Sequence, residues 1–201
     1  MKILIISGTP NKDGLCQSLV TAAFETAIKS GAETETVNLA DYELSPCKMC
    51  GNGWGKCLSE NRCEYGSEDG FDTIQSKCGE ADAFVFVTPV YYREPSEAFK
   101  TFLSRIRRCE STKNRSNGNV SSFVDKPSIL AASAGGGVGM IIALAEMERA
   151  LDHMGGVANP PMRNGIYDYI AVNSWNQEYK RDTLRAAVAS LIKSFESVLY
   201  E

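Results

Sequence analysis

The sequence predicts an α/β protein built on a doubly wound, five-stranded parallel sheet with helices on both faces. Short, continuous apolar runs of strand length recur along the chain, as expected for strands that are covered on both sides. The central runs end in loops of small and polar residues, after which apolar residues return at helical spacing. In a sheet of this kind the ligand site lies at the carboxyl ends of the strands, where strand order reverses.

The first strand-loop-helix unit is predicted at the start of the chain. Residues 3–6 are apolar and rich in β-branched side chains, and a glycine and a proline in the following loop end the strand. A helix is then expected from about Gly14 to Ser30, with a glycine directly after it. Residues 33–39 alternate between polar and apolar side chains, which predicts a half-exposed second strand.

Three further strands complete the predicted sheet. They are expected at residues 83–87, 128–132 and 166–172, each followed by helical periodicity. The final helix has the most regular apolar pattern, formed by Leu184, Val188, Leu191, Phe195 and Val198.

Residues 1–201 are expected to form a single domain, and two segments interrupt the regular pattern. Residues 41–79 form an insertion that contains five of the seven cysteines, four of them between residues 47 and 63. Residues 110–125 are rich in serine, asparagine and charge, which predicts a polar, mobile surface loop.

Composition excludes several classes of partner. A net charge of −4 and a pI near 5.2 provide no basic surface for nucleic acid. No segment approaches the roughly 20 apolar residues of a membrane span, and the chain enters a strand without a signal peptide. We therefore expect a cytoplasmic protein. In that compartment seven cysteines point to thiol, metal or redox chemistry more than to disulfides.

The loop after the first strand is predicted to bind a phosphate group. Hydroxyl and amide side chains there precede a helix N-terminus, where free N–H groups and the helix dipole favour an anion. The chain has neither G-x-G-x-x-G nor G-x-x-x-x-G-K-[S/T], so a single terminal monophosphate, as in FMN, fits best. An ordinary strand-to-helix turn is the alternative. The candidate residues are Ser7, Thr9, Pro10, Asn11, Gly14, Cys16, Gln17 and Ser18.

Two more loops offer surfaces for a flat ring. Aromatic side chains follow the third strand, and small residues that allow close backbone approach follow the fourth. Backbone N–H groups in the latter loop would stabilise a negatively charged reduced flavin. The alternatives are a tyrosine pair that closes the sheet edge and a flexible glycine loop. The candidate residues are Pro89, Val90, Tyr91, Tyr92, Ser133, Ala134, Gly135 and Gly136.

With these three loops the chain resembles the NAD(P)H-dependent FMN reductases of flavodoxin-like fold, and most of all the multimeric flavoproteins with a cysteine-bearing insertion. The resemblance implies FMN with its phosphate in the first loop and its ring against the other two. It also implies NAD(P)H as co-substrate and a homodimer or homotetramer. Two departures are Cys16, where relatives have threonine, and Asn11, where they often have arginine.

The cysteine-bearing insertion leaves several hypotheses open. Cys47, Cys50, Cys57 and Cys63 are separated by two, six and five residues. Four thiolates can bind an iron–sulfur cluster or zinc. Iron–sulfur flavoproteins, which the chain resembles, have a tighter spacing with the third cysteine where this chain has Gly53. We therefore favour structural thiols that cover the flavin, and zinc or a disulfide is the third possibility. Cys78 and Cys109 are expected to be buried.

The leading hypothesis is an oxidoreductase that moves electrons from NAD(P)H through bound FMN to a flavin, a quinone or another small acceptor. No catalytic side chain is expected, because the flavin itself carries the chemistry. One alternative is an iron–sulfur flavoprotein that acts as an electron carrier, with a cluster on Cys47, Cys50, Cys57 and Cys63. The other is a binding or regulatory module that has lost the flavin.

Overall fold

The computed structural model describes residues 1–116, 120–135, 139–155, 166–173 and 177–198. For residues 114–116, 166–173, 177 and 196–198 it describes the backbone alone.

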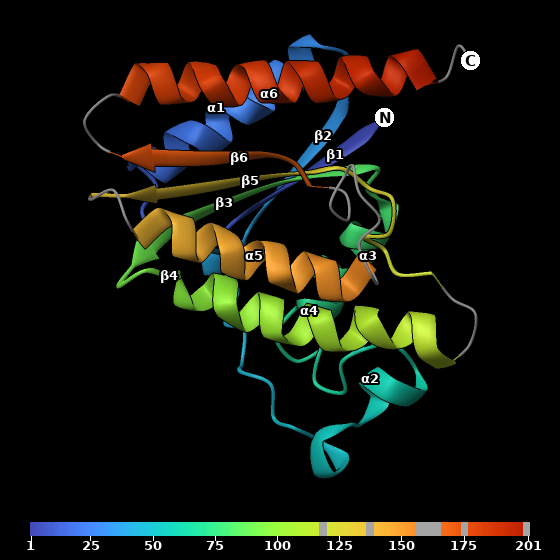
Figure 1. Ribbon diagram of the computed structural model, residues 1–201. Coiled ribbons are helices and arrows are strands. Elements are labelled where there is room, and N and C mark those ends of the chain that lie inside the picture. Colours follow the sequence, from blue (N-terminus) through green and yellow to red (C-terminus); the bar gives the residue numbers. More distant parts are fainter. Residues whose placement is uncertain (117–119, 136–138, 156–165, 174–176, 199–201) are drawn as a thin grey trace.

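The fold is a parallel sheet whose strand order is β2-β1-β3-β5-β6, as Figure 1 shows. A short strand, β4, pairs antiparallel with the end of β3. The predicted doubly wound sheet of five parallel strands is therefore confirmed. The strands are β1 (Lys2–Ser7), β2 (Glu33–Asn38), β3 (Ala83–Tyr91), β4 (Glu94–Pro95), β5 (Ser128–Ala134) and β6 (Ile166–Asn173).

Helices cover both faces of the sheet, and alternate residues of the central strands point to opposite layers. Ile3 and Ile5 of β1 are buried with α1 and α6, whereas Leu4 and Ile6 are buried with the other layer. This arrangement explains why the central strands are continuously apolar. The helices of the first layer are α1 (Leu15–Lys29) and α6 (Gln177–Val198), and those of the second are α3 (Phe71–Glu80), α4 (Glu97–Ser116) and α5 (Gly139–Gly155) (Figure 1).

The core beneath α4 is rich in phenylalanine. Phe86 on β3 meets Phe99 of α4 edge to face at 6.0 Å, and Phe99 in turn meets Phe102 at 6.2 Å. These rings are fully buried and attach the first half of α4 to the sheet. The position of α4 is therefore set by aromatic contacts from its N-terminal turns onwards.

The cysteine-bearing insertion lies on the side of α4 that faces away from the sheet (Figure 1). Its short elements are η1 (Leu39–Asp41), η2 (Gly51–Gly53) and α2 (Lys56–Ser59). The last part of the predicted insertion, however, is α3, which covers the sheet as an ordinary crossover helix. Phe71, Ile74 and Cys78 form its buried face, and the burial predicted for Cys78 is confirmed.

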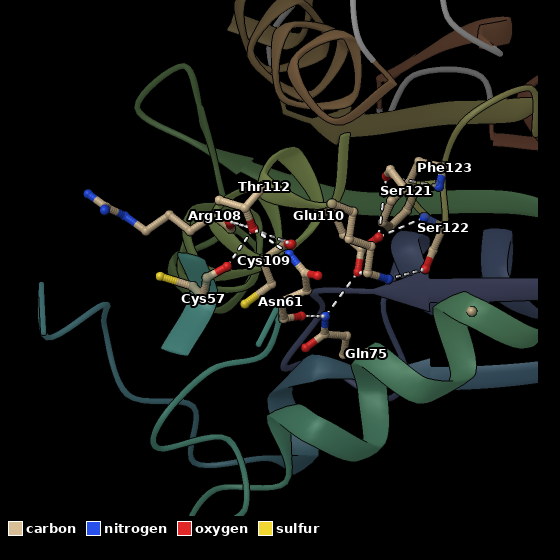
Figure 2. Close-up of polar contacts among 12 residues, drawn as sticks. Cys57, Asn61, Gln75, Arg108, Cys109, Glu110, Thr112, Ser121, Ser122 and Phe123 are labelled. Atoms are coloured by element: carbon tan, nitrogen blue, oxygen red, sulfur yellow. Dashed lines mark hydrogen bonds and ion pairs between the residues drawn. The ribbon is translucent and has the colours of Figure 1, made fainter. Parts of the chain in front are cut away.

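The prediction of a mobile polar loop at residues 110–125 was wrong over its first half. There the chain continues α4 as far as Ser116, with Glu110 fully buried. The polar side chains that suggested solvent exposure are instead hydrogen-bonded to distant segments (Figure 2). Gln75 Nε2 on α3 donates to Glu110 Oε1 at 2.9 Å, and the Ser122 backbone N–H donates to Oε2 at 2.7 Å.

No helix in the described ranges combines the length and apolar character needed to cross a bilayer.

Candidate functional site

The candidate site begins where the first strand ends, at the carboxyl edge of the sheet. Ser7 and Thr9 are buried, and their hydroxyl groups bond to the loop itself. The Thr9 N–H donates to Ser7 Oγ and the Asn11 N–H donates to Thr9 Oγ1, each at 3.3 Å. These hydroxyls therefore shape the first loop, residues 8–14, whereas Pro10 and Asn11 are exposed.

The N-terminus of α1 is left without a cap. Its N-cap residue, Gly14, makes no side-chain hydrogen bond, and the first turn contains no acidic residue. The first backbone bond of the helix runs from the Ser18 N–H to the Gly14 oxygen at 3.1 Å. The N–H groups before Ser18, which include those of Cys16 and Gln17, are therefore the donors that this helix end presents to an anion.

Cys16 connects the first loop to the loop that follows β5. Its thiol is buried and hydrogen-bonded with the Ser133 side chain. Burial raises the pKa of Cys16 to about 11, and the bond to Ser133 opposes this shift only in part. The thiol is therefore protonated at neutral pH, and it acts here as a link between two loops.

The second loop is a tight hairpin between β3 and β4. The apolar run predicts a third strand that ends at residue 87, but β3 continues to Tyr91, because its last residues pair with β4 and with β5. Tyr92 and Arg93 form the turn with φ of 50° and 73°, the signs of a type I′ hairpin. Tyr92 is fully exposed at 101%, so its side chain is free to cover a ligand.

Within this hairpin Pro89 is buried, Val90 is half-buried and Tyr91 is 52% exposed. The hairpin is attached to the first loop by Ser96, a residue outside the predicted site. Ser96 Oγ donates to the Gly8 oxygen at 2.7 Å, and its N–H donates to Thr88 Oγ1 at 3.1 Å.

The third loop follows β5 and begins inside the strand. Ser133 and Ala134 belong to β5, Gly135 is exposed with open space around its Cα, and Gly136 lies outside the described residues. At the other end of this loop, a Cβ on Gly139 would lie 3.3 Å from the Cα of Arg93. The second and third loops are therefore neighbours.

The three loops converge at the point where the strand order reverses. The chain leaves β1 toward β2 on one side and reaches β3 on the other, and β5 follows beside β3. Such a switch point is where open α/β sheets bind ligands. An uncapped helix end beside an exposed hairpin fits a ligand with an anionic end and a flat ring, which is the form of FMN.

A second candidate site lies in the insertion. Cys47, Cys50, Cys57 and Cys63 line one pocket, joined by the buried Cys109 of α4. We call it the thiol pocket. In the parts of the chain that the structure describes, no three cysteine, histidine or acidic side chains stand close enough together to hold a metal ion. The residues of the pocket also include Lys48, Lys56, Arg105 and Arg108.

Arg105 attaches the thiol pocket to α4. Its buried guanidinium forms an ion pair with Asp69, and it donates to Cys63 Sγ at 3.2 Å. Thr112, one turn after Arg108, lies within hydrogen-bonding distance of the Cys57 carbonyl and accepts a bond from Asn61 Nδ2 at 3.1 Å (Figure 2). The sequence predicts a role for neither Arg105 nor Asp69, because the two residues lie 36 positions apart in the chain.

Trp54 lies in the insertion and is 42% exposed. The Arg108 guanidinium is positioned over the Trp54 ring, 5.1 Å from its centre.

Comparison with known proteins agrees with this geometry. Residues 1–163 match the family described as NADPH-dependent FMN reductase. An iron-sulfur flavoprotein of Methanosarcina thermophila is 35% identical over 105 residues, which cover 52% of each chain. An iron-sulfur flavoprotein of Methanocaldococcus jannaschii is 36% identical over 107 residues, 53% of this chain and 52% of that protein. The chain thus matches about half the length of these curated relatives.

Solved structures share the fold over nearly the whole chain. An NAD(P)H:quinone oxidoreductase from Methanothermobacter marburgensis has a TM-score of 0.67 at 15% identity, covering 95% of this chain and 96% of that one. An FMN-dependent NADH-azoreductase from Bacillus anthracis, solved with FMN, has a TM-score of 0.63 at 10% identity, covering 97% and 99%. At these identities the likeness concerns the flavodoxin-like fold alone.

Proposed function

Because this chain belongs to the NADPH-dependent FMN reductase family, we propose that it is an FMN-dependent oxidoreductase that moves electrons from NAD(P)H to a quinone, a flavin or another small acceptor. The observation that carries the proposal is the convergence of three loops at the switch point of the sheet. The azoreductase and the quinone oxidoreductase of the same fold support a small acceptor.

The residues present suit FMN. The N–H groups at the start of α1 would hold the phosphate, and the hairpin at Tyr91 and Tyr92 would cover one part of the ring. Gly135 leaves room for the ring edge to approach the backbone. When bound, FMN supplies the redox chemistry by accepting hydride from the nicotinamide and releasing electrons to the acceptor. The protein positions both partners and excludes water from the covered side.

The test is a spectroscopic titration under anaerobic conditions. The purified protein is loaded with FMN, reduced with NADH or NADPH, and then mixed with 1,4-benzoquinone. We expect a flavin spectrum that bleaches with one of the nicotinamides and returns with the quinone. A protein that takes up no FMN would contradict the proposal and favour a module that has lost its cofactor.

The second candidate is an electron carrier with an iron–sulfur cluster. Two observations favour it: four cysteines of the insertion line one pocket, and iron-sulfur flavoproteins are among the relatives. Iron, sulfide and zinc assays on the same anaerobic preparation distinguish the candidates. Bound FMN without metal supports the reductase. Iron and sulfide in equal amounts, together with slow nicotinamide oxidation and rapid one-electron exchange, support the carrier.

We propose a homo-oligomer whose contact surface adjoins the candidate FMN site. Tyr91, Tyr92, Ile141 and Ile142 are exposed apolar side chains, and the approach of Gly139 to Arg93 brings their segments together. Light scattering after size exclusion measures the assembly, and Tyr92→Ser with Ile141→Ser should shift it toward the monomer. We also propose a cytoplasmic location, where seven free thiols stay reduced.

A further inference from the structure

The first loop contains a lysine, but its charge is directed elsewhere. The Lys12 side chain is 79% exposed, and its Nζ lies 3.7 Å from Asp41 Oδ1. Asp13 follows directly and cancels the local charge. A phosphate monoester carries nearly two negative charges at neutral pH. A cation from another part of the fold would therefore strengthen its binding at the α1 N-terminus.

Helix α6 brings such a cation to the first loop. Because α1 and α6 both begin at the carboxyl edge of the sheet and lie side by side, their first turns are neighbours (Figure 1). Arg181 Nη1 lies 3.5 Å from Ser18 Oγ, whose own proton is donated to the Leu15 oxygen at 2.8 Å. The guanidinium thus reaches from α6 to the first turns of α1.

The ion pairs around Arg181 allow it to turn toward a ligand. Glu178 bonds to Arg181 Nη2 at 2.5 Å and to Arg185 Nη1 at 3.0 Å. Arg185 also bonds to Asp182 at 2.7 Å. If Arg181 turns away, Glu178 therefore keeps a cationic partner. The Glu178 side chain is 62% exposed, so water also compensates for the change.

We propose that Arg181 is a cofactor-binding residue, which supplies from α6 the positive charge for the 5′-phosphate of FMN that the first loop lacks. The inference rests on the proposed function, because it concerns the same cofactor. An arginine suits this role, since its planar fork can bond two phosphate oxygens at once.

The test compares FMN with riboflavin, which lacks the phosphate. Dissociation constants of the apoprotein for both flavins are measured by flavin fluorescence for the wild type, Arg181→Gln and Arg181→Lys. We expect Arg181→Gln to weaken FMN binding about tenfold or more while riboflavin binding stays within about twofold. Arg181→Lys should restore part of the loss.

Matched variants sharpen the comparison. Arg185→Gln removes a cation from the next turn of the same helix, and Lys12→Gln removes the lysine of the first loop. Both should leave FMN affinity within about twofold. Glu178→Gln should tighten FMN binding by a few-fold, because it releases Arg181 from its competing carboxylate. Thermal unfolding followed by circular dichroism shows whether the variants remain folded.

Several outcomes would overturn the role of Arg181. The proposal fails if the Arg181→Gln variant binds FMN as tightly as the wild type, or if its affinities for FMN and riboflavin fall equally. It also fails if Lys12→Gln causes the phosphate-specific loss instead. In those cases the wild type still binds FMN, and the proposed function stands. A wild type that binds neither flavin would overturn both proposals.

Discussion

The Arg105 guanidinium and the Asp69 carboxylate form an ion pair in which both side chains are almost completely buried, 2% and 7% exposed. Arg105 also donates to the Ser45 oxygen at 3.1 Å and lies over the Phe71 ring, 4.3 Å from its centre. A residue of α4 thus holds both ends of the insertion, near Ser45 and near Asp69. This pair explains how a segment with few helical turns keeps a defined position on the fold.

Removal of either charge should destabilise the protein strongly. Asp69→Asn or Arg105→Met leaves the other group buried without its partner, which costs about 3–5 kcal/mol. The double variant Asp69→Leu with Arg105→Met should recover a large part of that loss, because no charge stays buried. Urea denaturation measures the free energy of unfolding of the single variants and of the double variant. Single variants that lose less than about 1 kcal/mol would mean that the pair is well solvated.

The same pair predicts a loss of stability in acid. Burial alone would raise the pKa of Asp69, but hydrogen bonds from Arg105 and the backbone outweigh burial and hold the pKa below its ordinary value of 3.8. A lowered folded pKa gives stability that is complete above the unfolded pKa and is lost as pH falls through the folded one. The difference in unfolding free energy between wild type and Asp69→Asn should therefore shrink below about pH 4. A difference that stays constant down to pH 3 would contradict this reasoning.

Cys16, the cysteine of the candidate cofactor site, should react more slowly than Cys47 and Cys57 of the insertion. With a pKa of about 11, only about a thousandth of it is thiolate at pH 8, and the side chain is buried. Iodoacetamide should therefore label the half-buried Cys47 and Cys57 of the insertion long before Cys16. Peptide mass spectrometry at successive times measures the order in which the cysteines are labelled. In urea-unfolded protein the difference between Cys16 and the other cysteines should disappear. Early labelling of Cys16 would mean that the bond to Ser133 opens readily.

Gly8 of the first loop and Gly135 of the third loop should respond differently to replacement by alanine. A Cβ on Gly8 would meet the Ser96 side chain and approach the Phe99 ring to 2.9 Å, whereas Gly135 has open space around it. Gly8→Ala should therefore lower stability by about 1–3 kcal/mol. Gly135→Ala should leave the unfolding free energy nearly unchanged and weaken FMN binding. Thermal melts and FMN titrations of both variants separate these effects, and equal stabilities would contradict the prediction.

The hairpin turn should gain stability from a glycine. Arg93 has a φ of 73°, in the left-handed region that a side chain disfavours. Arg93→Gly should stabilise the protein by about 1 kcal/mol, because it relieves this backbone strain. Arg93→Ala is the control, since it removes the side chain and keeps the strained conformation. If both variants melt at the same temperature, the turn is not strained.

The sheet could be predicted from the sequence because its central strands are short apolar runs, such as residues 3–6 and 83–87. The second half of α4 could not, because its burial depends on partners far away in the chain. Glu110 is a typical surface residue by sequence, yet it is fully buried with Gln75 and Ser122 as partners. Local periodicity does not report contacts of this kind.

The candidate site, too, could be predicted from the sequence only in part. The first and third loops could be located from strand ends and glycines, and Cys16 could be singled out as a departure. That its thiol would meet Ser133 depends on the neighbouring positions of the two loops in the folded sheet. The contribution of Arg181 has no local sequence signal at all, because Ser18 lies 163 residues away from it in the chain.

Helix α4 runs from the candidate FMN site to the thiol pocket. Its first residue, Glu97, stands at the carboxyl edge of the sheet beside the hairpin, and Cys109 faces the thiol pocket. Twelve residues of helix at 1.5 Å each separate them by about 18 Å along the axis. A reagent bound at Cys109 therefore lies about 18 Å along the axis of α4 from the strand edge. A displacement passed along this helix would have to move a segment whose phenylalanine side chains are buried against the sheet.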